Sequence, residues 1–276
     1  MKFTVLGSGS TGNALLISSE ETNVLIDAGL SAREILRRLG VVGVSSDDLD
    51  GIVITHEHSD HVGGLRVLLR AVDCPVFISK CTEDAFYDTR AGGQNGDSES
   101  SKRQAALKEK VVEIDSDHEF RIGDIDFEPF CVPHDAADNF GFVARQDGVR
   151  VATLMDFGHI SELIKEKLKG CDAIVVESNH SRDMLRACPV YTWELKQRIM
   201  SRTGHLSNED LSDWLTNDFD GSARYIVLAH LSQRANEPHL ARITAESALA
   251  MRPPLFRAET AVSLSNYKEP TEWFTF

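Results

Sequence analysis

Short apolar runs rich in branched residues alternate with turn residues along the first half of the chain. Runs of this kind, bounded by Gly, Ser and Asn, are typical of buried β-strands. Ser31 followed by Glu34 is the start signal of a helix, and Gly40 is a stop signal. The pattern predicts strands at residues 3–6, 14–17, 23–27 and 51–55, and helices at 31–40 and 62–70.

The second half begins with strands and continues with helices. Turn signals at Gly123-Asp124 and Asp147-Gly148 divide a mostly extended region into hairpins. The later helices have start signals of their own, such as Ser207 before residue 208 and Pro238 in a first turn. The pattern predicts strands within 111–154 and at 173–177 and 224–228, and helices at 161–169, 192–201, 208–217 and 237–250.

This order of elements predicts an α/β fold in which two β-sheets face each other and helices cover the outside. No change in composition marks a linker, so we expect residues 1–276 to form a single domain. Residues 91–104 are rich in Gly, Ser, Asp and Asn, which indicates a flexible surface insertion.

The chain contains no targeting or membrane signal. No apolar run approaches the roughly 20 residues of a membrane span, and the N-terminus reads directly as a strand. The five cysteines are scattered and never in C-x-x-C spacing, which indicates reduced thiols. We therefore expect a cytoplasmic protein without a membrane partner.

The charge balance limits how the protein could bind nucleic acid. Lys and Arg number 29 and Asp and Glu number 43, which gives a net charge of −14 with neutral His. A protein that coats DNA is usually basic, because it must neutralise phosphates. Any nucleic-acid site in this chain must therefore be local, and bound metal could contribute to its positive charge.

The segment His56-Glu57-His58-Ser59-Asp60-His61 places four metal-binding side chains within six residues, directly after a predicted strand. On a turn that leads into a helix, these side chains point in different directions. His56 and His58 can therefore serve one ion while Asp60 and His61 serve a second. Such a ligand set suits zinc or manganese, and also iron or nickel. A His-rich site without cysteine more often keeps a position open for water.

Four further candidate ligands follow apolar runs that read as strands. An apolar run that ends in one His or Asp directs that side chain to the rim of the sheet, where open sites collect. Together with the histidine cluster they could complete a site for two ions. These residues are Asp27, His134, Asp156 and His230.

In this order of motifs the sequence resembles the metallo-β-lactamase-fold hydrolases. The resemblance implies a four-layer αββα sandwich with a two-metal site, with Asp27 orienting the histidine cluster. Asp60 would also take part in catalysis. The implied ligands are His56, His58 and His134 for the first ion, Asp60, His61 and His230 for the second, and Asp156 as a bridge between the two.

The resemblance narrows to the bacterial WalJ (YycJ)-like branch. It rests on the glycine-rich loop at residues 7–13 and on segments 132–136, 177–180, 204–208 and 230–232. Members of this branch are regarded as metal-dependent DNA exonucleases. RNA-processing relatives carry a β-CASP domain between the bridging Asp and the last His. Here only about 74 residues separate Asp156 from His230, too few for that domain.

Other polar groups must bind the phosphate or protonate the leaving oxygen. His180 and His205 are the candidates, and a helix that starts just after His205 offers free N–H groups to an anion. The same motifs suggest substrate contacts for four further residues, although Ser207 could be only a helix cap. These four are Asn13, Asn179, Ser207 and Asn208.

The stretch from His180 to His205 is locally basic. It carries five basic side chains, Arg182, Arg186, Lys196, Arg198 and Arg202, against two acidic ones, Asp183 and Glu194. This stretch could follow a nucleic-acid backbone, or it could be an ordinary solvated helix face. Tyr191 and Trp193 are the aromatic residues nearby, and we expect no stacking platform because both could belong to the core.

These observations favour a two-metal hydrolase of phosphodiester bonds, expected to be a DNA exonuclease that uses a metal-bridging hydroxide. Two ions about 3.5–4 Å apart can clamp a phosphate for in-line attack. A second hypothesis is a small-molecule hydrolase of the same fold, acting on a thioester, a cyclic phosphodiester or a lactam. A third is a metal-bound scaffold without enzymatic activity.

Overall fold

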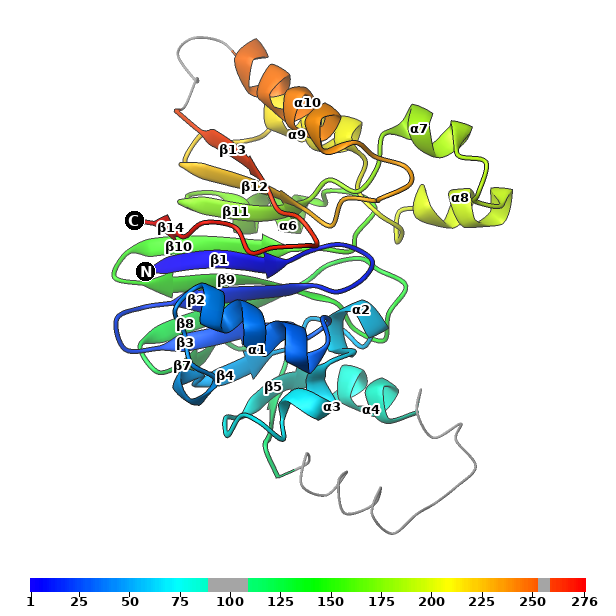
Figure 1. Ribbon diagram of the computed structural model, residues 1–276. Helices are drawn as coiled ribbons and strands as arrows, with labels where there is room; N and C mark the ends of the chain where they lie inside the picture. The colour runs from blue at the N-terminus through cyan, green and yellow to red at the C-terminus, as the bar shows by residue number, and fades with distance from the viewer. Residues whose placement is uncertain (89–108, 253–258) are drawn as a thin grey trace.

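The computed structural model describes residues 1–88, 109–252 and 259–276. Within these residues the strands form two seven-stranded sheets that lie face to face, with helices on both outer sides (Figure 1). The predicted α/β fold, an αββα sandwich, is confirmed. The surface insertion predicted at residues 91–104 lies outside the described residues.

The first sheet comes from the N-terminal half of the chain and is completed by the C-terminal strand. β3 to β6 pair in parallel, whereas β14, β1, β2 and β3 pair antiparallel. The strand order is β14 (Phe274–Thr275), β1 (Lys2–Gly7), β2 (Ala14–Ser18), β3 (Asn23–Ile26), β4 (Gly51–Val53), β5 (Val76–Ser79) and β6 (Val111–Ile114).

The second sheet combines two hairpins with a parallel region. The turns predicted at residues 123–124 and 147–148 join β7 to β8 and β9 to β10, and β10 to β13 pair in parallel. The strand order is β13 (Ala261–Leu264), β12 (Tyr225–Ala229), β11 (Ala173–Glu177), β10 (Val149–Leu154), β9 (Phe140–Gln146), β8 (Ile125–Cys131) and β7 (Phe120–Ile122).

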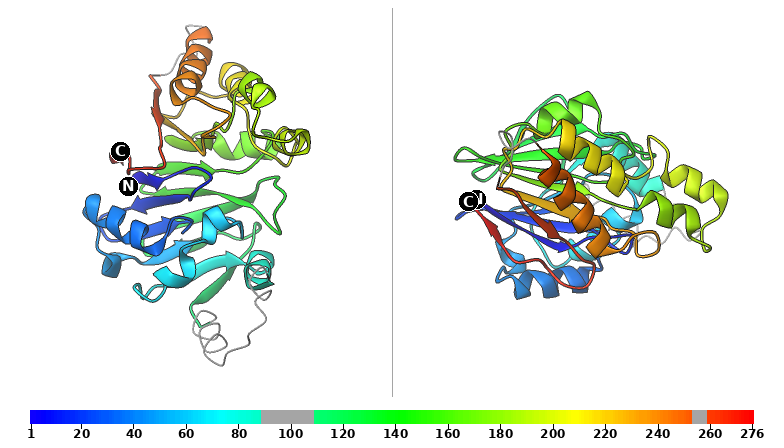
Figure 2. Two further views of the ribbon diagram at one scale, coloured as in Figure 1. Left: turned by 45° about the vertical axis from the view of Figure 1, so that its right-hand side comes forward. Right: turned by 90° about the horizontal axis from the view of Figure 1, so that it is seen from above.

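Helices cover the outer faces of both sheets. The first sheet carries α1 (Ala32–Val41), α3 (Leu65–Leu68) and α4 (Lys80–Asp88), with a 3-10 turn, η1 (Ser46–Asp48), nearby. The second carries α6 (Glu162–Leu168), α9 (Asn208–Asn217) and α10 (Pro238–Met251). Beyond the ends of the strands stand α2 (Ser59–Val62), α7 (Arg182–Ala187) and α8 (Trp193–Ile199), and α7 and α8 project furthest (Figure 2).

Successive residues of β2 show why the strands read as continuous apolar runs. Leu15 and Ile17 pack between the sheets against residues such as Phe142, whereas Leu16 packs outward with Ile35 of α1. Side chains of a strand alternate between its two faces, and here both faces are covered. All four layers are therefore held together by apolar contacts.

The helix predicted at residues 62–70 is wrong in one respect. The structure has two one-turn helices, α2 and α3, with Gly63 and Gly64 between them. A Cβ placed on Gly64 would lie 2.0 Å from the carbonyl oxygen of Leu30. The backbone N–H of Gly64 donates to the carbonyl of Ala28, and the N–H of Ala28 donates to the carbonyl of His61, so these groups bond to another segment and not along a continuous helix.

Several short elements were not predicted from the pattern, including β5, α4, α7, β13 and β14. Helix α7 begins after Ser181, whose side chain accepts a hydrogen bond from the backbone N–H of Met184. All five cysteines are free thiols. Among the described residues, no helix combines the length and the apolar character needed to cross a bilayer.

Candidate metal centre

The candidate ligands come together where five strands end. β3 and β4 run parallel in one sheet, and β10, β11 and β12 run parallel in the other. Parallel strands place their carboxyl ends on one edge, where open α/β sheets carry their ligand sites. At or just beyond these strand ends lie Asp27, His56, Asp156, Glu177 and His230.

Three of these residues have a left-handed backbone. The φ angles are 61° at Asp27, 58° at Asp156 and 54° at His230. For residues other than glycine this conformation costs roughly 1–2 kcal/mol. Strain of this kind collects at functional sites, where the surrounding structure holds it in place. Here it turns each side chain from the end of its strand toward the others.

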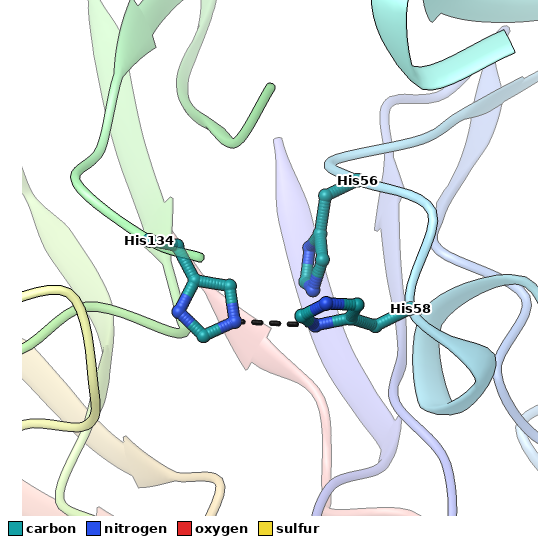
Figure 3. Close-up of side chains that lie close together, drawn as sticks. All are labelled: His56, His58 and His134. Atoms are coloured by element: carbon teal, nitrogen blue, oxygen red, sulfur yellow. Dashed lines mark hydrogen bonds between the residues drawn. The ribbon is translucent and has the colours of Figure 1, made fainter. Parts of the chain in front are cut away.

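One group of candidate ligands consists of three imidazoles, from His56, His58 and His134, whose ligand atoms all lie within 4.8 Å of one another (Figure 3). His58 and His56 come from the segment after β4, whereas His134 comes from the loop after β8. His134 Nε2 and His58 Nδ1 are 3.2 Å apart. The three rings therefore form the set that the sequence suggested for the first ion.

A second group contains Asp60, His61 and His230, again with ligand atoms within 4.8 Å of one another. Oδ2 of Asp60 lies 3.3 Å from Nε2 of His230 and 3.7 Å from Nε2 of His61. His61 is fully buried and His230 is almost so. This group matches the set suggested for the second ion.

Asp156 lies between the two groups. Its Oδ2 atom is 2.7 Å from Nε2 of His61 and 3.9 Å from Nε2 of His56. Its other oxygen is 3.0 Å from Nδ1 of His230. The carboxylate is 2% exposed and is therefore shielded from water. It occupies the position at which a residue shared by two ions would be required.

Four of the five predicted imidazole ligands are held through Nδ1. A histidine whose Nδ1 is engaged by the protein presents Nε2 to an ion in a fixed ring orientation. The partners of Nδ1 are Thr55 Oγ1 for His56 at 3.0 Å, Asp27 for His61 at 2.7 Å, the Thr203 carbonyl for His134 at 3.0 Å and Glu177 for His230 at 2.7 Å.

Asp27 is hydrogen-bonded to His61 and to Thr55, the residue just before His56. One of its oxygens accepts hydrogen bonds from the backbone N–H and the hydroxyl of Thr55, and the other accepts one from His61. Asp27 and His61 are both fully buried. The carboxylate therefore orients His61 directly and the segment before His56 through Thr55.

The electrostatics of the site couple its acids and its imidazoles. Burial alone would raise the pKa of Asp156, but His230 and His61 hold it well below its usual value. Burial alone would lower the pKa of His61, but Asp27 and Asp156 hold it well above. Burial does lower the pKa of His56. The carboxylates thus create a site that attracts positive charge.

This donor set fits divalent ions. Nε2 of His56 is buried and has no hydrogen-bond partner among the described residues. A buried polar atom without a partner costs free energy, so its position calls for a ligand. Imidazole with carboxylate is the chemistry that zinc and manganese accept. The residues therefore fit one ion at each group, with Asp156 between them.

The role of Glu177 was not predicted from the sequence. This carboxylate has no exposed surface, and one oxygen accepts hydrogen bonds from Nδ1 of His205 and of His230. The other accepts from the backbone N–H groups of Phe157 and Leu206. The available signal was the same as for Asp27, an apolar strand that ends in an acid.

An open cavity of about 370 Å³ adjoins the two groups. Asp60, His58 and Asp156 line it together with His205, while Tyr191 and neighbouring residues of α8 form a further part of its lining. The candidate ligands are therefore accessible from one side, which a catalytic centre requires and a closed structural site does not.

Two of the predicted substrate residues line this cavity, Asn179 and His205. Asn179 also donates a hydrogen bond to the backbone carbonyl of His230. His205 has 24% of its side chain exposed and holds Nδ1 against Glu177 at 2.8 Å. These two side chains are in a position to contact a bound substrate.

The other predicted substrate residues lie elsewhere. Asn13 is fully buried, and its amide contacts Asp60 and His61. Ser207 caps α9, and Asn208 is hydrogen-bonded to Ser178 and Asn236 in a buried amide network. Each of these three side chains has a partner inside the protein, and none of them is among the residues that line the cavity.

His180 is also buried, with 2% of its surface exposed, and it is not among the residues that line the cavity. Burial lowers its pKa to about 4. Its backbone pairs with that of Ser207. The structure therefore brings His205 to the cavity and buries His180 away from its lining.

The basic stretch is less positive than its composition suggested, because its side chains have partners. Arg182 pairs with Asp210, Arg198 with Asp135, and Arg186 with Asp183. Lys196 donates to a backbone carbonyl, and Arg202 contacts His159. Two of the acidic partners, Asp135 and Asp210, come from outside the stretch.

Tyr191 and Trp193, which could have belonged to the core, lie outside it. Trp193 is 58% exposed, and Tyr191 is half-buried in the lining of the cavity. Both stand at the start of α8, which projects beyond the ends of the strands. An aromatic ring therefore does reach the candidate site.

Sequence comparison identifies relatives across most of the chain. A family model described as the beta-lactamase superfamily domain matches residues 22–230. Exodeoxyribonuclease YycJ of Bacillus anthracis is 34% identical over 257 residues, which are 90% of this chain and 89% of the relative. Exodeoxyribonuclease WalJ of Streptococcus pneumoniae serotype 2 (strain D39) is 34% identical over 90% of this chain and 88% of its own.

Solved structures share the fold at lower identity. Zn²⁺-bound PqqB from Methylobacterium extorquens superimposes with a TM-score of 0.70 at 15% identity, over 99% of this chain and 100% of that one. The metallo-β-lactamase-fold protein YhfI from Bacillus subtilis superimposes with a TM-score of 0.68 at 15% identity, over 98% of this chain and 99% of that one. On these comparisons the chain belongs to the β-lactamase superfamily, has the metallo-β-lactamase fold, and is a member of the family that includes YycJ and WalJ.

Proposed function

We propose that this protein is a two-metal phosphodiesterase that removes nucleotides from DNA ends. The observation that carries the proposal is the pair of ligand groups on either side of Asp156, open to a cavity that His205 also lines. The names of YycJ and WalJ, both exodeoxyribonucleases, support DNA as the substrate.

The proposed ligands divide as the two groups do. His56, His58 and His134 would hold one ion, and a second would be held by Asp60, His61 and His230, with Asp156 between them. Bound there, two divalent ions would polarise a phosphoryl oxygen and activate a water molecule for attack.

His205 is the proposed proton donor to the leaving oxygen. Burial alone would lower its pKa, but Glu177 and Asp156 raise it to about 10, so the ring is charged at neutral pH. Because Nδ1 is engaged by Glu177, Nε2 is the nitrogen available to a substrate oxygen. A positioned acid of this kind contributes about 10²–10⁴-fold to a rate.

The pKa and the position of His180 argue against it as the proton donor. Its pKa of about 4 leaves the ring neutral at pH 7, and its side chain does not line the cavity. A neutral, buried imidazole could not deliver a proton to a substrate bound at the metal ligands. We therefore assign proton donation to His205 alone.

The net charge of −14 shapes how DNA would be bound. Outside the metal centre an acidic surface repels phosphate, whereas bound ions would concentrate positive charge at one place. The proposal therefore predicts weak DNA affinity without metal and a shallow dependence of binding on salt.

The direct test is an exonuclease assay on the purified protein, loaded with Mn²⁺ or Zn²⁺, with end-labelled duplex and single-stranded DNA. We expect metal-dependent release of nucleotides from the labelled end. Asp60→Asn should abolish the activity, whereas His118→Ala, at an exposed histidine outside the site, should leave it intact. No cleavage by protein shown by elemental analysis to hold two ions would contradict the proposal.

One observation favours the alternative of a small-molecule hydrolase. The cavity of about 370 Å³ is of the size that binds small ligands, commonly about 300–1,000 Å³. This alternative predicts turnover of a thioester or a cyclic nucleotide by metal-loaded protein that does not degrade DNA. The two activities can be compared on one preparation.

A further inference from the structure

The cavity beside the candidate metal centre has an apolar side. Tyr191 lies just before α8, and Leu195 and Ile199 are four residues apart on one face of that helix. All three line the same cavity as the metal ligands Asp60 and Asp156. A molecule whose phosphate reached the ligands would therefore meet this apolar side with another part of its structure.

The side chain of Tyr191 is not engaged in polar or ring contacts with the described residues. Its phenol makes no hydrogen bond and its ring makes no aromatic or cation contact within residues 1–88, 109–252 and 259–276. The neighbouring Thr192, by contrast, caps α8 with its side chain. The cap holds the start of the helix in place while the aromatic ring beside it stays available.

Apart from the proposed ions, the described part of the chain offers a DNA substrate little positive charge at the cavity. It carries a net charge of −14, and Arg198, the basic residue among those that line the cavity in the described part of the chain, is paired with Asp135. Stacking of a base on an aromatic side chain is worth about 1–3 kcal/mol and tolerates every base, because each has a π-face. Such tolerance suits an enzyme that must remove any nucleotide.

We propose that Tyr191 stacks on a base of the nucleic-acid substrate, next to the phosphodiester held at the metal centre. Leu195 and Ile199 cover the remaining apolar edge of that base. This inference rests on the proposed phosphodiesterase function and adds a base-binding subsite to it. The predicted ligand is a nucleobase of any of the four kinds.

The test compares a thymidine oligonucleotide with one of equal length made of abasic tetrahydrofuran units, which presents the same phosphodiesters without bases. Wild-type protein should cleave the abasic strand with a kcat/KM about 5- to 150-fold lower, as the stacking energy implies. Tyr191→Ala should lose that factor on the thymidine strand, mainly in KM, and nothing on the abasic strand.

Three further variants separate stacking from folding. Tyr191→Phe keeps the ring and should behave as wild type, whereas Tyr191→Leu keeps bulk without the ring and should behave as Tyr191→Ala. Val190→Ala changes the adjacent side chain, 63% exposed, and should leave both substrates unaffected. Melting temperatures of all variants show whether the fold is intact.

A binding measurement provides a readout apart from turnover. An oligonucleotide with 2-aminopurine beside a phosphorothioate link, which resists cleavage, should lose fluorescence on binding to wild-type protein and less on binding to Tyr191→Ala. Cleavage of both substrates with an equal base effect in wild type and Tyr191→Ala would overturn this inference alone. Cleavage of neither by wild type would overturn the proposed function, and this inference with it.

Discussion

Glu177 accepts a hydrogen bond from Nδ1 of His205 at 2.8 Å. The same oxygen accepts one from Nδ1 of His230 at 2.7 Å, and the carboxylate has no exposed surface. One buried acid thus connects a proposed metal ligand with the imidazole on the cavity wall. The proposed metal binding and the proposed proton transfer are therefore physically coupled.

Glu177→Gln removes this charge while keeping the shape of the side chain. Because Glu177 is, with Asp156, one of the two carboxylates that raise the pKa of His205 to about 10, its loss should lower that pKa. The charged form of His205 is present below its pKa and is lost as pH rises through it. The alkaline limb of the kcat profile should therefore move to lower pH, with kcat falling by up to about 10²–10⁴-fold at neutral pH.

The measurement is a pH–rate profile of metal-loaded protein on end-labelled DNA. Glu246→Gln, at an exposed carboxylate paired with Arg242, is the matched control and should leave the profile unchanged. An alkaline limb at the same pH in wild type and Glu177→Gln would exclude His205 as the acid that depends on Glu177.

Asp27→Asn should weaken metal binding without removing a proposed ligand. The carboxylate holds His61 through Nδ1 at 2.7 Å and also accepts hydrogen bonds from Thr55. Loss of such a supporting partner typically costs about 10–100-fold in metal affinity. Competition with a metal-binding dye would measure the change. Asp115→Asn disrupts a similar but exposed pair with His118 and should have no effect on affinity.

Gly29→Ala should displace α2, the short helix that carries Asp60. A Cβ at residue 29 would lie 1.6 Å from the backbone carbonyl oxygen of Asp60, a contact that only movement of the backbone could relieve. We expect a loss of about 1–3 kcal/mol in the free energy of unfolding, together with weaker binding of one ion. Gly40→Ala, where a Cβ meets nothing within 4 Å, is the control and should not destabilise the protein.

Arg38→Ala tests how the N-terminal strand is fixed to α1 and to the segment before β14. The side chain is 4% exposed and donates hydrogen bonds to the backbone carbonyls of Leu6 and Tyr267 and to Glu34. Leaving these acceptors unpaired should cost about 2–4 kcal/mol in the free energy of unfolding.

Denaturant titration of the metal-free protein checks this value. Arg37→Ala removes the neighbouring, exposed side chain, which also pairs with Glu34, and it should cost much less. Equal effects of Arg37→Ala and Arg38→Ala would contradict the role assigned to the buried contacts of Arg38.

The residues of the candidate centre were largely predictable because they follow strong local patterns. The segment from His56 to His61 is dense in ligands, and Asp27, Asp156 and His230 each follow an apolar run. Parallel strands carry such residues to one edge of a sheet. A local pattern was therefore enough to predict that candidate ligands far apart in the sequence lie close together. Glu177 ends a strand in the same way and was overlooked because an acid after an apolar run is common.

What went wrong depended on contacts between distant residues. At the break between α2 and α3, the backbone groups of His61 and Gly64 bond to Ala28 in a distant segment, which the local sequence does not reveal. Two arginines of the basic stretch form ion pairs with Asp135 and Asp210, which lie outside that stretch. Ser207 and Asn208 were available as polar residues in the sequence but are occupied by a helix cap and an amide network.

The sequence alone was sufficient to predict the alternation of strands and helices, the types of candidate ligand and the order of these ligands along the chain. These features depend on the period of hydrophobic residues and on residue chemistry. Only the folded chain decided that His205 reaches the cavity while His180 is buried, and that Tyr191 lines the same cavity as the proposed metal ligands. The physical reason is that exposure and partnership are properties of packing. Two histidines that the sequence suggested for the same role therefore lie in opposite environments.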